Sequence, residues 1–314
     1  MKMNYYFLGF MLLSFLSSTT NILAQDKEPF IKHVYIADPS ARVFNGRMYV
    51  YTSHDLDTAT YWNMKDWHVF SSDNLADWKD HGAFFSLKDI SWATKWAWAP
   101  DAVQRKNKFY FYYPVDRNKI GVAVAKTPVG PFKDSGKPLI NNAGQTEKIG
   151  PEPIDPAILI DDDGKAYMYF GCRQLRAVKL KKNMVQVDGD VQKVSISNIA
   201  QYKENEGGYY GEGPWAFKRN GLYYLMYSNG WAKKSTLVYA TSNSPLGPFT
   251  YQGEVMYPVN AVTSHGSIVE YKGKWYVFYH NRKLSGDKYR RSVCFDEITF
   301  NADGKINRLS GPGL

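Results

Sequence analysis

A pattern with a period near 55 residues recurs five times between Asp38 and Tyr279, and this repeat constrains the fold more than any other feature of the chain. Each copy opens on a polar anchor residue, continues as a short apolar strand, turns, and returns as a strand rich in tyrosine. Successive anchors are 63, 54, 57 and 53 residues apart. A supersecondary unit repeated at such spacing is typical of propellers and solenoids, in which neighbouring units bury each other's faces. The anchors are Asp38, Asp101, Asp155, Glu212 and His265.

The turns inside the repeats indicate that each copy is a sheet of antiparallel strands. Asn45-Gly46, Asp163-Gly164 and Asn220-Gly221 each lie between two apolar runs. Tight hairpins need positive φ, which Gly, Asn and Asp adopt at the least cost. A third short run follows the hairpin, as at Gly121–Ala125, and a Gly-Pro-Phe turn comes next in two copies. Four strands per repeat with almost no helical periodicity predict an all-β protein, a single five-bladed β-propeller with four antiparallel strands per blade.

The composition agrees with one large domain. A chain of 314 residues holds either two ordinary domains or one large one, and the repeats favour a single propeller domain over residues 25–314. An aromatic fraction of 16% excludes a disordered chain, and the lack of several long apolar runs excludes a membrane bundle. Tyr, Phe and Trp favour strands and also stack on sugar rings, so the aromatic excess indicates β structure and also suits a carbohydrate ligand.

The cysteines and the net charge carry less information. Cys172 and Cys294 have neither metal-ligand spacing nor a CxxC motif, and we interpret both as buried small side chains rather than a disulfide or a nucleophile. The net charge is +9, but Lys and Arg are scattered singly along the chain. This pattern argues against a nucleic-acid partner and favours no more than weak attraction to acidic polymers.

The first 24 residues predict a secretory signal peptide. Lys2 precedes an apolar run from Tyr5 to Leu16, and a polar stretch then leads to Ala24, after which we place the cleavage. A single membrane anchor is the alternative, but a run of 12 residues is short for a span. We therefore expect an exported protein, periplasmic or extracellular, with no membrane span once residues 1–24 are removed.

The predicted fold brings the five anchors together. The first strand of each propeller blade lines the central channel, so the starts of these strands face one end of it. Four carboxyl groups and an imidazole converge there, at a cost in desolvation and repulsion that stability alone would hardly select. The alternative is that each Asp merely caps a turn. Clustered carboxylates either bind a cation or divide into an acid and a base, and the second arrangement is what inverting glycoside hydrolysis requires.

The anchors lie in five short motifs, which are Ala37-Asp38-Pro39-Ser40, Trp98-Ala99-Pro100-Asp101, Ile154-Asp155-Pro156-Ala157, Gly211-Glu212-Gly213-Pro214 and Ser264-His265-Gly266-Ser267. In this order they resemble glycoside hydrolase family 43, and a late segment, Arg290-Arg291-Ser292-Val293, fits as well. The resemblance covers nearly the whole chain after the signal peptide. It implies a five-bladed propeller that hydrolyses α-L-arabinofuranosides or β-D-xylosides of plant cell-wall polysaccharides with inversion.

The resemblance also implies roles for individual residues. Asp38 is similar to the family's general base and Glu212 to its general acid. Asp155 resembles the carboxylate that raises the pKa of the acid and orients it. Arg291 resembles an arginine expected to hydrogen-bond the sugar. Arg290 is the alternative, because a slip of one residue in a strand reverses the facing of a side chain.

Four further residues complete the expected site. His265 resembles the histidine that approaches a channel cation, usually calcium, which is otherwise held mainly by water. Imidazole is in general a poor ligand for so hard an ion, so we expect a structural or electrostatic role for the metal. We expect Trp98 and Trp215 to offer stacking faces, and Asp101 to bind the sugar or to support residues that do. Trp96 and Trp231 are further candidates for stacking.

The leading hypothesis is an exported, inverting glycosidase that removes terminal pentoses from plant cell-wall saccharides, with α-L-arabinofuranose favoured over β-D-xylose. We expect segments 56–67 and 141–152 to form the rim of its pocket and to set this preference. We also expect exo action, a monomer, calcium in the channel and no organic cofactor. The alternatives are a sugar-binding propeller without catalysis and a related propeller glycosidase that acts on fructans or other sugars.

Overall fold

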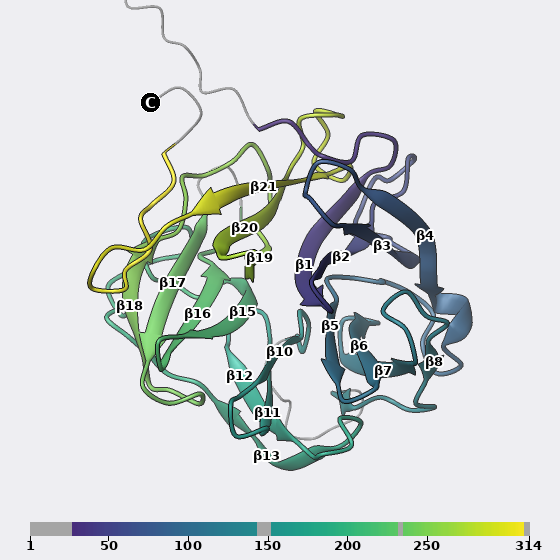
Figure 1. Ribbon diagram of the computed structural model, residues 1–314, viewed down its shortest axis with the longest axis horizontal. Coiled ribbons are helices and arrows are strands. Elements are labelled where there is room, and N and C mark those ends of the chain that lie inside the picture. The colour runs from purple at the N-terminus through teal and green to yellow at the C-terminus, as the bar shows by residue number, and fades with distance from the viewer. Residues whose placement is uncertain (1–26, 143–151, 232–234, 311–314) are drawn as a thin grey trace, which may run out of the picture.

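In the computed structural model the chain folds into five small β-sheets set around a central axis (Figure 1). The structure describes residues 27–142, 152–231 and 235–310. Within these ranges the only helical element is one 3-10 turn, Leu87–Asp89, and no helix is long and apolar enough to cross a membrane. The expected signal peptide, residues 1–24, lies outside the described residues. The prediction of an all-β, five-bladed propeller is confirmed.

Each sheet is one blade, and its strands follow one another along the chain. The first blade contains β1 (Ile36–Phe44), β2 (Arg47–His54), β3 (Asp66–Ser72) and β4 (Lys79–Ser86), and the second contains β5 (Asp101–Arg105), β6 (Lys108–Val115), β7 (Lys119–Ala125), β8 (Lys133–Asp134) and β9 (Ile140–Asn141). The third contains β10 (Ala157–Ile160), β11 (Ala166–Phe170), β12 (Arg176–Leu180) and β13 (Val187–Lys193). The fourth contains β14 (Ile196–Ser197), β15 (Glu212–Arg219), β16 (Leu222–Ser228), β17 (Leu237–Ser242) and β18 (Phe249–Glu254), and the fifth contains β19 (Gly266–Tyr271), β20 (Lys274–Asn281) and β21 (Ser292–Ile298).

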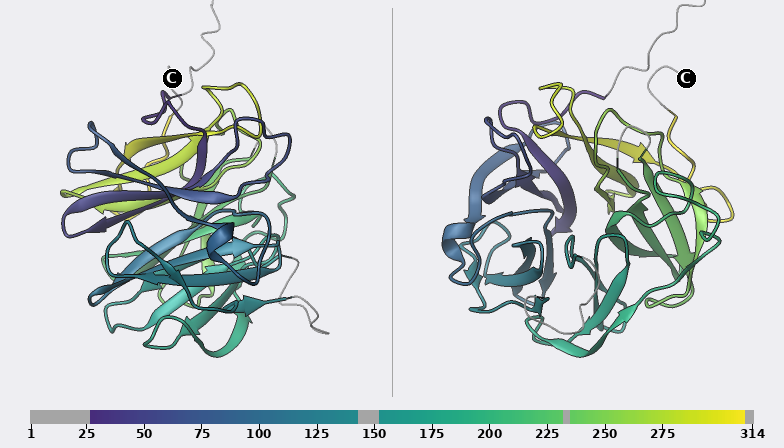
Figure 2. Two further views of the ribbon diagram at one scale, coloured as in Figure 1. Left: turned by 90° about the vertical axis from the view of Figure 1, so that its right-hand side faces the viewer. Right: turned by 180° about the vertical axis from the view of Figure 1, so that it is seen from behind.

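The number of strands varies from blade to blade, whereas the repeat predicted four in each. The second and fourth blades gain a short strand, because β9 pairs with β7 and β14 pairs with β18. The described part of the fifth blade has three strands. Beside β21 the N–H groups of Phe30 and Ile36 donate to the carbonyls of Val293 and Arg291 at 3.2 and 3.0 Å. The segment that leads into the first blade therefore closes the ring against the last blade, as both views along the axis show (Figures 1 and 2).

The predicted hairpin turns are confirmed. Asn45 and Gly46 have φ values of 51° and 76° and connect Phe44 to Arg47, which pair with each other. The Asn220-Gly221 turn repeats this conformation, with φ values of 49° and 80°. Two successive residues with positive φ match the right-handed twist of the strands they join. The turn residues thus fix the register of each first strand against its return strand, and this register sets which residues reach the channel.

The tyrosine-rich return strands fill the space between neighbouring blades. Tyr51 and Trp67 of the first blade belong to one buried cluster with Phe111 and Tyr113 of the second. A buried phenol needs a hydrogen-bond partner, and the hydroxyl of Tyr51 donates to the carbonyl of Pro128 at 2.5 Å. Most of the aromatic excess is therefore explained by the fold. Both cysteines are free and buried, as predicted.

Candidate active site

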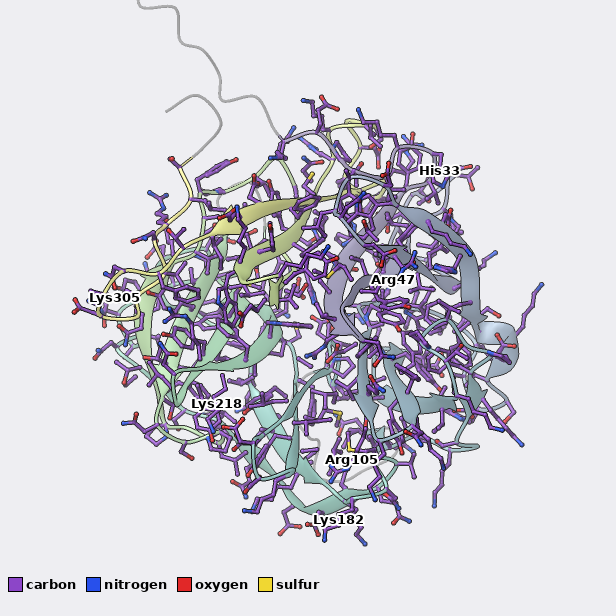
Figure 3. The ribbon with its side chains drawn as sticks, in the orientation of Figure 1. His33, Arg47, Arg105, Lys182, Lys218 and Lys305 are labelled. Atoms are coloured by element: carbon purple, nitrogen blue, oxygen red, sulfur yellow. The ribbon has the colours of Figure 1, made fainter. Side chains whose placement is uncertain are left out.

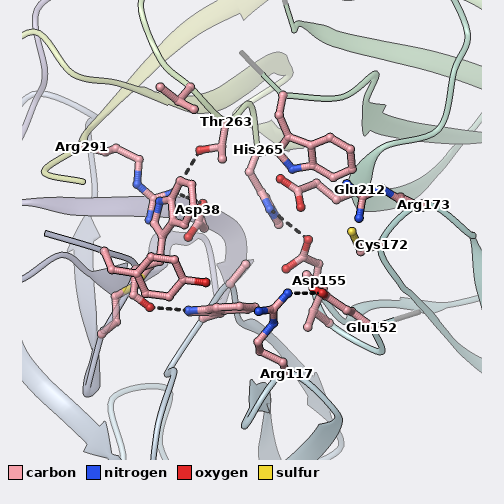
Figure 4. A pocket seen from close by; sticks show the side chains of 18 residues that line it. Asp38, Arg117, Glu152, Asp155, Cys172, Arg173, Glu212, Thr263, His265 and Arg291 are labelled. Carbon is pink, nitrogen blue, oxygen red and sulfur yellow. Dashed lines mark hydrogen bonds and ion pairs between the residues drawn. The ribbon is translucent and has the colours of Figure 1, made fainter. Parts of the chain in front are cut away.

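A pocket of about 320 Å³ lies where the first strands of the blades begin (Figure 4). This volume is near the lower end of the range for small-ligand sites. All five blades contribute to the pocket, through residues at or just before β1, β5, β10, β15 and β19. Six of the eight principal predicted site residues line it, namely Asp38, Trp98, Asp155, Glu212, His265 and Arg291. Of the two further candidates for stacking, Trp231 lines the pocket and Trp96 does not.

The backbone turns sharply at the residues that precede proline. Asp38 and Asp155 have φ values of 54° and 56°, and Gly213 has 64°. The pairing register of both β1 and β15 shifts at this point. Such bulges re-aim side chains, and strain of this kind is concentrated at functional sites. Gly213, and not Glu212 as the sequence alignment of anchors implied, is therefore the structural equivalent of Asp38 and Asp155, and Glu212 enters the pocket from one residue earlier.

Asp38 is paired with a buried cation. The Nη1 group of Arg291 donates to Oδ1 of Asp38 at 2.8 Å, while Nε and Nη2 donate to the two carboxylate oxygens of Asp55 at 2.9 Å each. All three side chains are nearly inaccessible to solvent. Burial is the largest single effect and raises the pKa of Asp38, but Arg291, the two neighbouring histidines and the Ser53 hydroxyl together outweigh it, and the resulting pKa is lowered to about 2. Asp38 is therefore an ionised carboxylate at neutral pH.

Two uncharged side chains complete the surroundings of Asp38. The Ser53 hydroxyl donates to its Oδ2 at 2.6 Å, and the Asp38 N–H donates to Nδ1 of His280 at 3.2 Å. Burial, together with the charge of Arg291, lowers the pKa of His280 to about 3. Because Nδ1 accepts a hydrogen bond, Nε2 carries the proton and donates to the Thr263 carbonyl at 2.9 Å. His280 thus fixes the backbone of Asp38 without adding a charge.

Asp155 and Glu212 lie on the side of the pocket away from Arg291 (Figure 4). Burial raises the pKa of Asp155 well above its ordinary value, and the charge of Glu212 adds to this effect. Glu212 keeps part of its surface open to the pocket, but enclosure by the protein still raises its pKa to about 8, against a lowering contribution from the Trp231 hydrogen bond. Within the described residues neither carboxyl forms an ion pair with Lys or Arg. The pair therefore retains a proton at neutral pH.

His265 lies beside this pair, with Nδ1 at 3.9 Å from Oδ2 of Asp155. Its ring packs directly on Gly213, where a Cβ atom would come within 3.0 Å of Nδ1. Burial lowers the pKa of His265, so its ring is neutral and has a lone pair available for a cation. Among the described residues, however, it has no two further His, Cys, Asp or Glu donors grouped with it. The site therefore fits a cation that takes most of its ligands from water.

Asp101 and Trp215 do not line the pocket, so we do not retain them as sugar contacts. Asp101 is fully buried and accepts hydrogen bonds from the Arg42 guanidinium at 2.5 and 3.0 Å and from the Ile158 N–H at 2.7 Å. Arg42 also lies 4.1 Å above the ring of Trp215, whose Nε1 donates to the Ile268 carbonyl at 2.8 Å. These contacts use the polar atoms of both residues to join the inner strands of the blades.

The choice between the two neighbouring arginines is resolved. Arg291 points into the pocket, whereas Arg290 donates from Nη1 to the carbonyl of Asp57 at 3.0 Å and lies 3.6 Å from Asp287. The side chain of Arg290 is 32% exposed and that of Arg291 is 3% exposed. The two side chains of adjacent residues point in opposite directions, as expected at the start of a strand.

The sequence analysis missed several residues that the structure places at the site. Asp55 and His280 come at the ends of the tyrosine-rich strands β2 and β20. A return strand ends beside the start of the strand it pairs with, so polar residues at these ends reach the same rim as the anchors. This rule could have identified both. Arg117, which pairs with Glu152 in the pocket wall, lies in a loop that the repeat pattern does not describe, whereas Glu152 is the last residue of the predicted rim segment 141–152.

Aromatic side chains form part of the pocket wall. Tyr61 and Trp62 come from segment 56–67, which confirms its predicted contribution to the rim. Trp62 packs edge-on against Tyr289 with ring centroids 5.0 Å apart, and its carbonyl accepts a hydrogen bond from Nε1 of Trp98 at 2.7 Å. Of segment 141–152, only positions 141, 142 and 152 lie within the described residues, and Glu152 lines the pocket.

Comparison with known proteins gives a consistent result. The model of the family "Glycosyl hydrolases family 43" matches residues 27–306. Xylosidase/arabinosidase 43A of Humicola insolens is 38% identical over 88% of this chain and 98% of its own length, and a xylosidase/arabinosidase of Bacteroides ovatus is 35% identical over 91% and 98%. Among solved structures, a β-xylosidase/α-arabinofuranosidase from a compost microbial metagenome, in complex with xylotriose and in a calcium-free form, has a TM-score of 0.83 and 36% identity, covering 93% of this chain and 99% of its own.

Proposed function

The chain belongs to glycoside hydrolase family 43, and we propose that it is an exported, inverting enzyme that removes terminal pentoses from plant cell-wall saccharides. Family membership and relatives at 35–38% identity make it a glycosidase that hydrolyses glycosidic bonds. One observation supports the proposed mechanism above all. Two buried carboxyl environments with opposite pKa shifts face each other in a single pocket.

We assign Asp38 as the general base, because it stays ionised and can accept a proton from water. The water oxygen then forms a bond with the anomeric carbon while the bond to the leaving oxygen breaks. Glu212, which holds a proton at neutral pH, is the general acid and transfers that proton to the leaving oxygen. Asp155, which shares the retained proton of the pair with Glu212, is assigned as the carboxyl that modulates the pKa of Glu212 and orients the acid. Water supplies its OH group to the sugar, and its remaining proton stays on Asp38.

The names of the relatives bear on the substrate. Those of Humicola insolens and Bacteroides ovatus are called xylosidase/arabinosidase, and that of Xylanibacter ruminicola is called β-xylosidase. We therefore place β-D-xylosides first and α-L-arabinofuranosides second, which reverses the order favoured by the sequence. We assign two contacts to the sugar. One is Nη1 of Arg291, which also donates to Asp38, and the other is the ring of Trp98.

A hydrated divalent cation, calcium by analogy with the compost enzyme, is proposed to bind near His265. When bound it supplies positive charge to the floor of the pocket. His265 would hold it through its neutral imidazole, with water as the remaining ligand.

The experiment that tests the function is an assay of the protein on 4-nitrophenyl β-D-xylopyranoside and α-L-arabinofuranoside, followed by xylo- and arabino-oligosaccharides. We expect release of single pentoses, with faster xylose release. ¹H NMR of the first product anomer should show inversion, and retained configuration would refute the assignment of Asp38 as base. A sugar-binding propeller without catalysis would bind xylotriose and release nothing. Intact mass of protein recovered from the exported fraction tests cleavage after Ala24.

A further inference from the structure

Away from the pocket, two histidines and one carboxylate meet at the end of the first blade. Nδ1 of His54 lies 2.7 Å from Oδ1 of Asp66, and Nε2 of His68 lies 3.5 Å from the same oxygen. One donor atom from each residue lies within 4.8 Å of the other two. In the part of the chain that the structure describes, this is the one group of three or more His, Cys, Asp or Glu donors so arranged, and none of its members lines the catalytic pocket.

The pairing of β2 with β3 builds this group. Thr52 lies opposite His68 and Ser53 lies opposite Trp67, so the same register places His54 opposite Asp66. Side chains two residues apart on a strand share a face, and diagonal neighbours remain within reach of each other. The rings of His54 and His68 accordingly lie with centroids 4.5 Å apart. The same face is apolar further along the strands, where Val50 pairs with Phe70. The cluster, defined here as His54, Asp66 and His68, is thus a localised polar site at the end of a buried face.

We propose that this cluster binds a divalent transition-metal ion, with zinc as the best match and water in the remaining positions. Zinc bonds to imidazole nitrogen and carboxylate oxygen are roughly 2.0–2.2 Å long, which places neighbouring ligand atoms of a tetrahedral ion roughly 3.3–3.6 Å apart. The 3.5 Å separation between His68 and Asp66 lies in this range, whereas the 2.7 Å contact between His54 and Asp66 is a hydrogen bond, whose proton the ion would replace as the two atoms move apart. Two imidazoles and one carboxylate suit zinc, cobalt and nickel, whereas calcium and magnesium prefer oxygen ligands throughout.

The surroundings suit a bound ion. The side chains of His54, Asp66 and His68 are 20%, 23% and 12% exposed, so an ion can enter and yet be partly shielded from water. Of the six histidines in the chain, four lie between positions 33 and 81, and the other two, His265 and His280, serve the catalytic pocket.

The position of the cluster gives the metal a structural consequence. His54 stands between Ser53, which donates to Asp38, and Asp55, which holds Arg291. An ion bound to His54 would fix the end of β2 that carries both of these contacts. Metal binding itself does not depend on the proposed glycosidase activity, so the two can be tested separately.

The test uses the full-length exported protein after treatment with a chelator. Co²⁺, a coloured substitute for Zn²⁺, is titrated in, and its visible absorption and the metal-to-protein ratio after dialysis are measured. The wild-type protein should bind one Co²⁺ and show the intense visible absorption that is typical of a Co²⁺ ion with few ligands. Zn²⁺ should compete with Co²⁺ for the site. At 100 times its dissociation constant, Zn²⁺ should raise the melting temperature by roughly 5 °C. His68→Gln and Asp66→Asn should each abolish the absorption and the thermal shift.

Matched controls come from the same blade and from the pocket. His33→Gln, at the outer edge of the blade (Figure 3), and His81→Gln should keep the cobalt absorption, because neither residue belongs to the cluster. His265→Gln should keep it too, which separates the cluster from a cation in the channel. Absence of the absorption in the wild-type protein would overturn the proposal. So would its survival in both cluster variants, or its loss in His265→Gln alone.

Discussion

The two sides of the pocket contain the same kind of group in opposite states. On one side Asp38 has the Arg291 guanidinium at 2.8 Å, and its pKa is lowered to about 2. On the other side Glu212 has no such cation among the described residues, and burial raises its pKa to about 8. Burial alone would raise the pKa of both carboxyls. Arg291, held in turn by Asp55, makes the largest of the contributions that keep Asp38 ionised, and the neighbouring histidines and Ser53 add to it. This set of partners, which Glu212 lacks among the described residues, distinguishes the proposed base from the proposed acid.

The largest effect should come from removing the proton donor. Glu212→Gln keeps the shape of the side chain but cannot transfer a proton, so kcat/KM on xylobiose should fall by roughly 10²–10⁴-fold. The loss should be much smaller on a 4-nitrophenyl glycoside, whose leaving group needs little protonation. Steady-state kinetics on both substrates measure the difference. Equal losses on both would show that Glu212 is not the acid.

Removing the Arg291 guanidinium should reduce the difference in pKa between the carboxyls on the two sides of the pocket. Arg291→Met leaves Asp38 and Asp55 buried without a charge partner, which should cost roughly 3–5 kcal/mol of unfolding free energy. The pKa of Asp38 should rise, so kcat/KM should fall as pH decreases towards and below neutrality. The double variant Asp55→Leu/Arg291→Met removes the buried pair together and serves as the control. It should recover much of the stability in denaturant titrations and still show the acidic loss of activity, whereas a pH profile like that of the wild-type protein would contradict the role of Arg291.

The side of the pocket that contains the general acid can be tested through the alkaline limb of the pH profile, where kcat/KM decreases. The general acid must be protonated, so kcat/KM should decrease as pH rises through an apparent value of about 8, which belongs to the Asp155–Glu212 pair. In Asp155→Asn the pair is reduced to one ionisable group, so the second ionisation no longer has to overcome repulsion, and the limb should move to lower pH by about one unit. A limb that stays in place would show that Asp155 does not act on the acid.

The contributions of Asp38 and Glu212 to folding stability should also depend on pH in opposite directions. The folded pKa of Asp38 is lowered, so its contribution is present above its ordinary value of 3.8 and is lost as pH falls towards about 2. The folded pKa of Glu212 is raised, so its contribution is full below 4.5 and is lost as pH rises through about 8. Melting curves should therefore depend less on acidic pH in Asp38→Asn and less on alkaline pH in Glu212→Gln. Identical pH dependence in both variants and the wild-type protein would contradict the assigned shifts.

The smallest effect is expected at Arg290, which lies next to Arg291 in sequence but outside the pocket. Arg290→Gln should change kcat/KM by less than about threefold and unfolding free energy by about 0.5 kcal/mol or less. A large loss of activity in this variant would mean that the site depends on the outer ends of the strands, and not on the buried cation alone.

The parts of this molecule that follow local rules could be predicted from the sequence. Hairpin turns such as Asn45-Gly46 and the tyrosine-rich return strands determine the blades, and the blades determine that Asp38, Asp155 and His265 meet. The anchors themselves were less uniform than their alignment suggested. Asp101 has the position of an anchor, yet Arg42 binds its carboxylate away from the pocket. Only the three-dimensional packing of several blades decides such a contact.

The contact of Arg291 with the proposed base likewise could not be predicted from the repeats. Asp55 and Arg291 are 236 positions apart and join the first and last blades only once the ring is closed. The sequence could suggest Arg291 through family resemblance, but it could not show that this arginine pairs with the base and not with the acid. That fact depends on which blades are neighbours across the closure.

The most direct test of this account is a ¹³C NMR titration of the Asp and Glu carboxyl carbons in the free enzyme, with Asp38→Asn and Glu212→Gln used to assign the two resonances. The account predicts that the Asp38 signal remains that of a carboxylate down to about pH 3, and that the Glu212 signal moves with a midpoint near 8. If both signals titrate together near pH 4, the pocket does not separate the two carboxyls, and the assignment of base and acid from their surroundings is wrong.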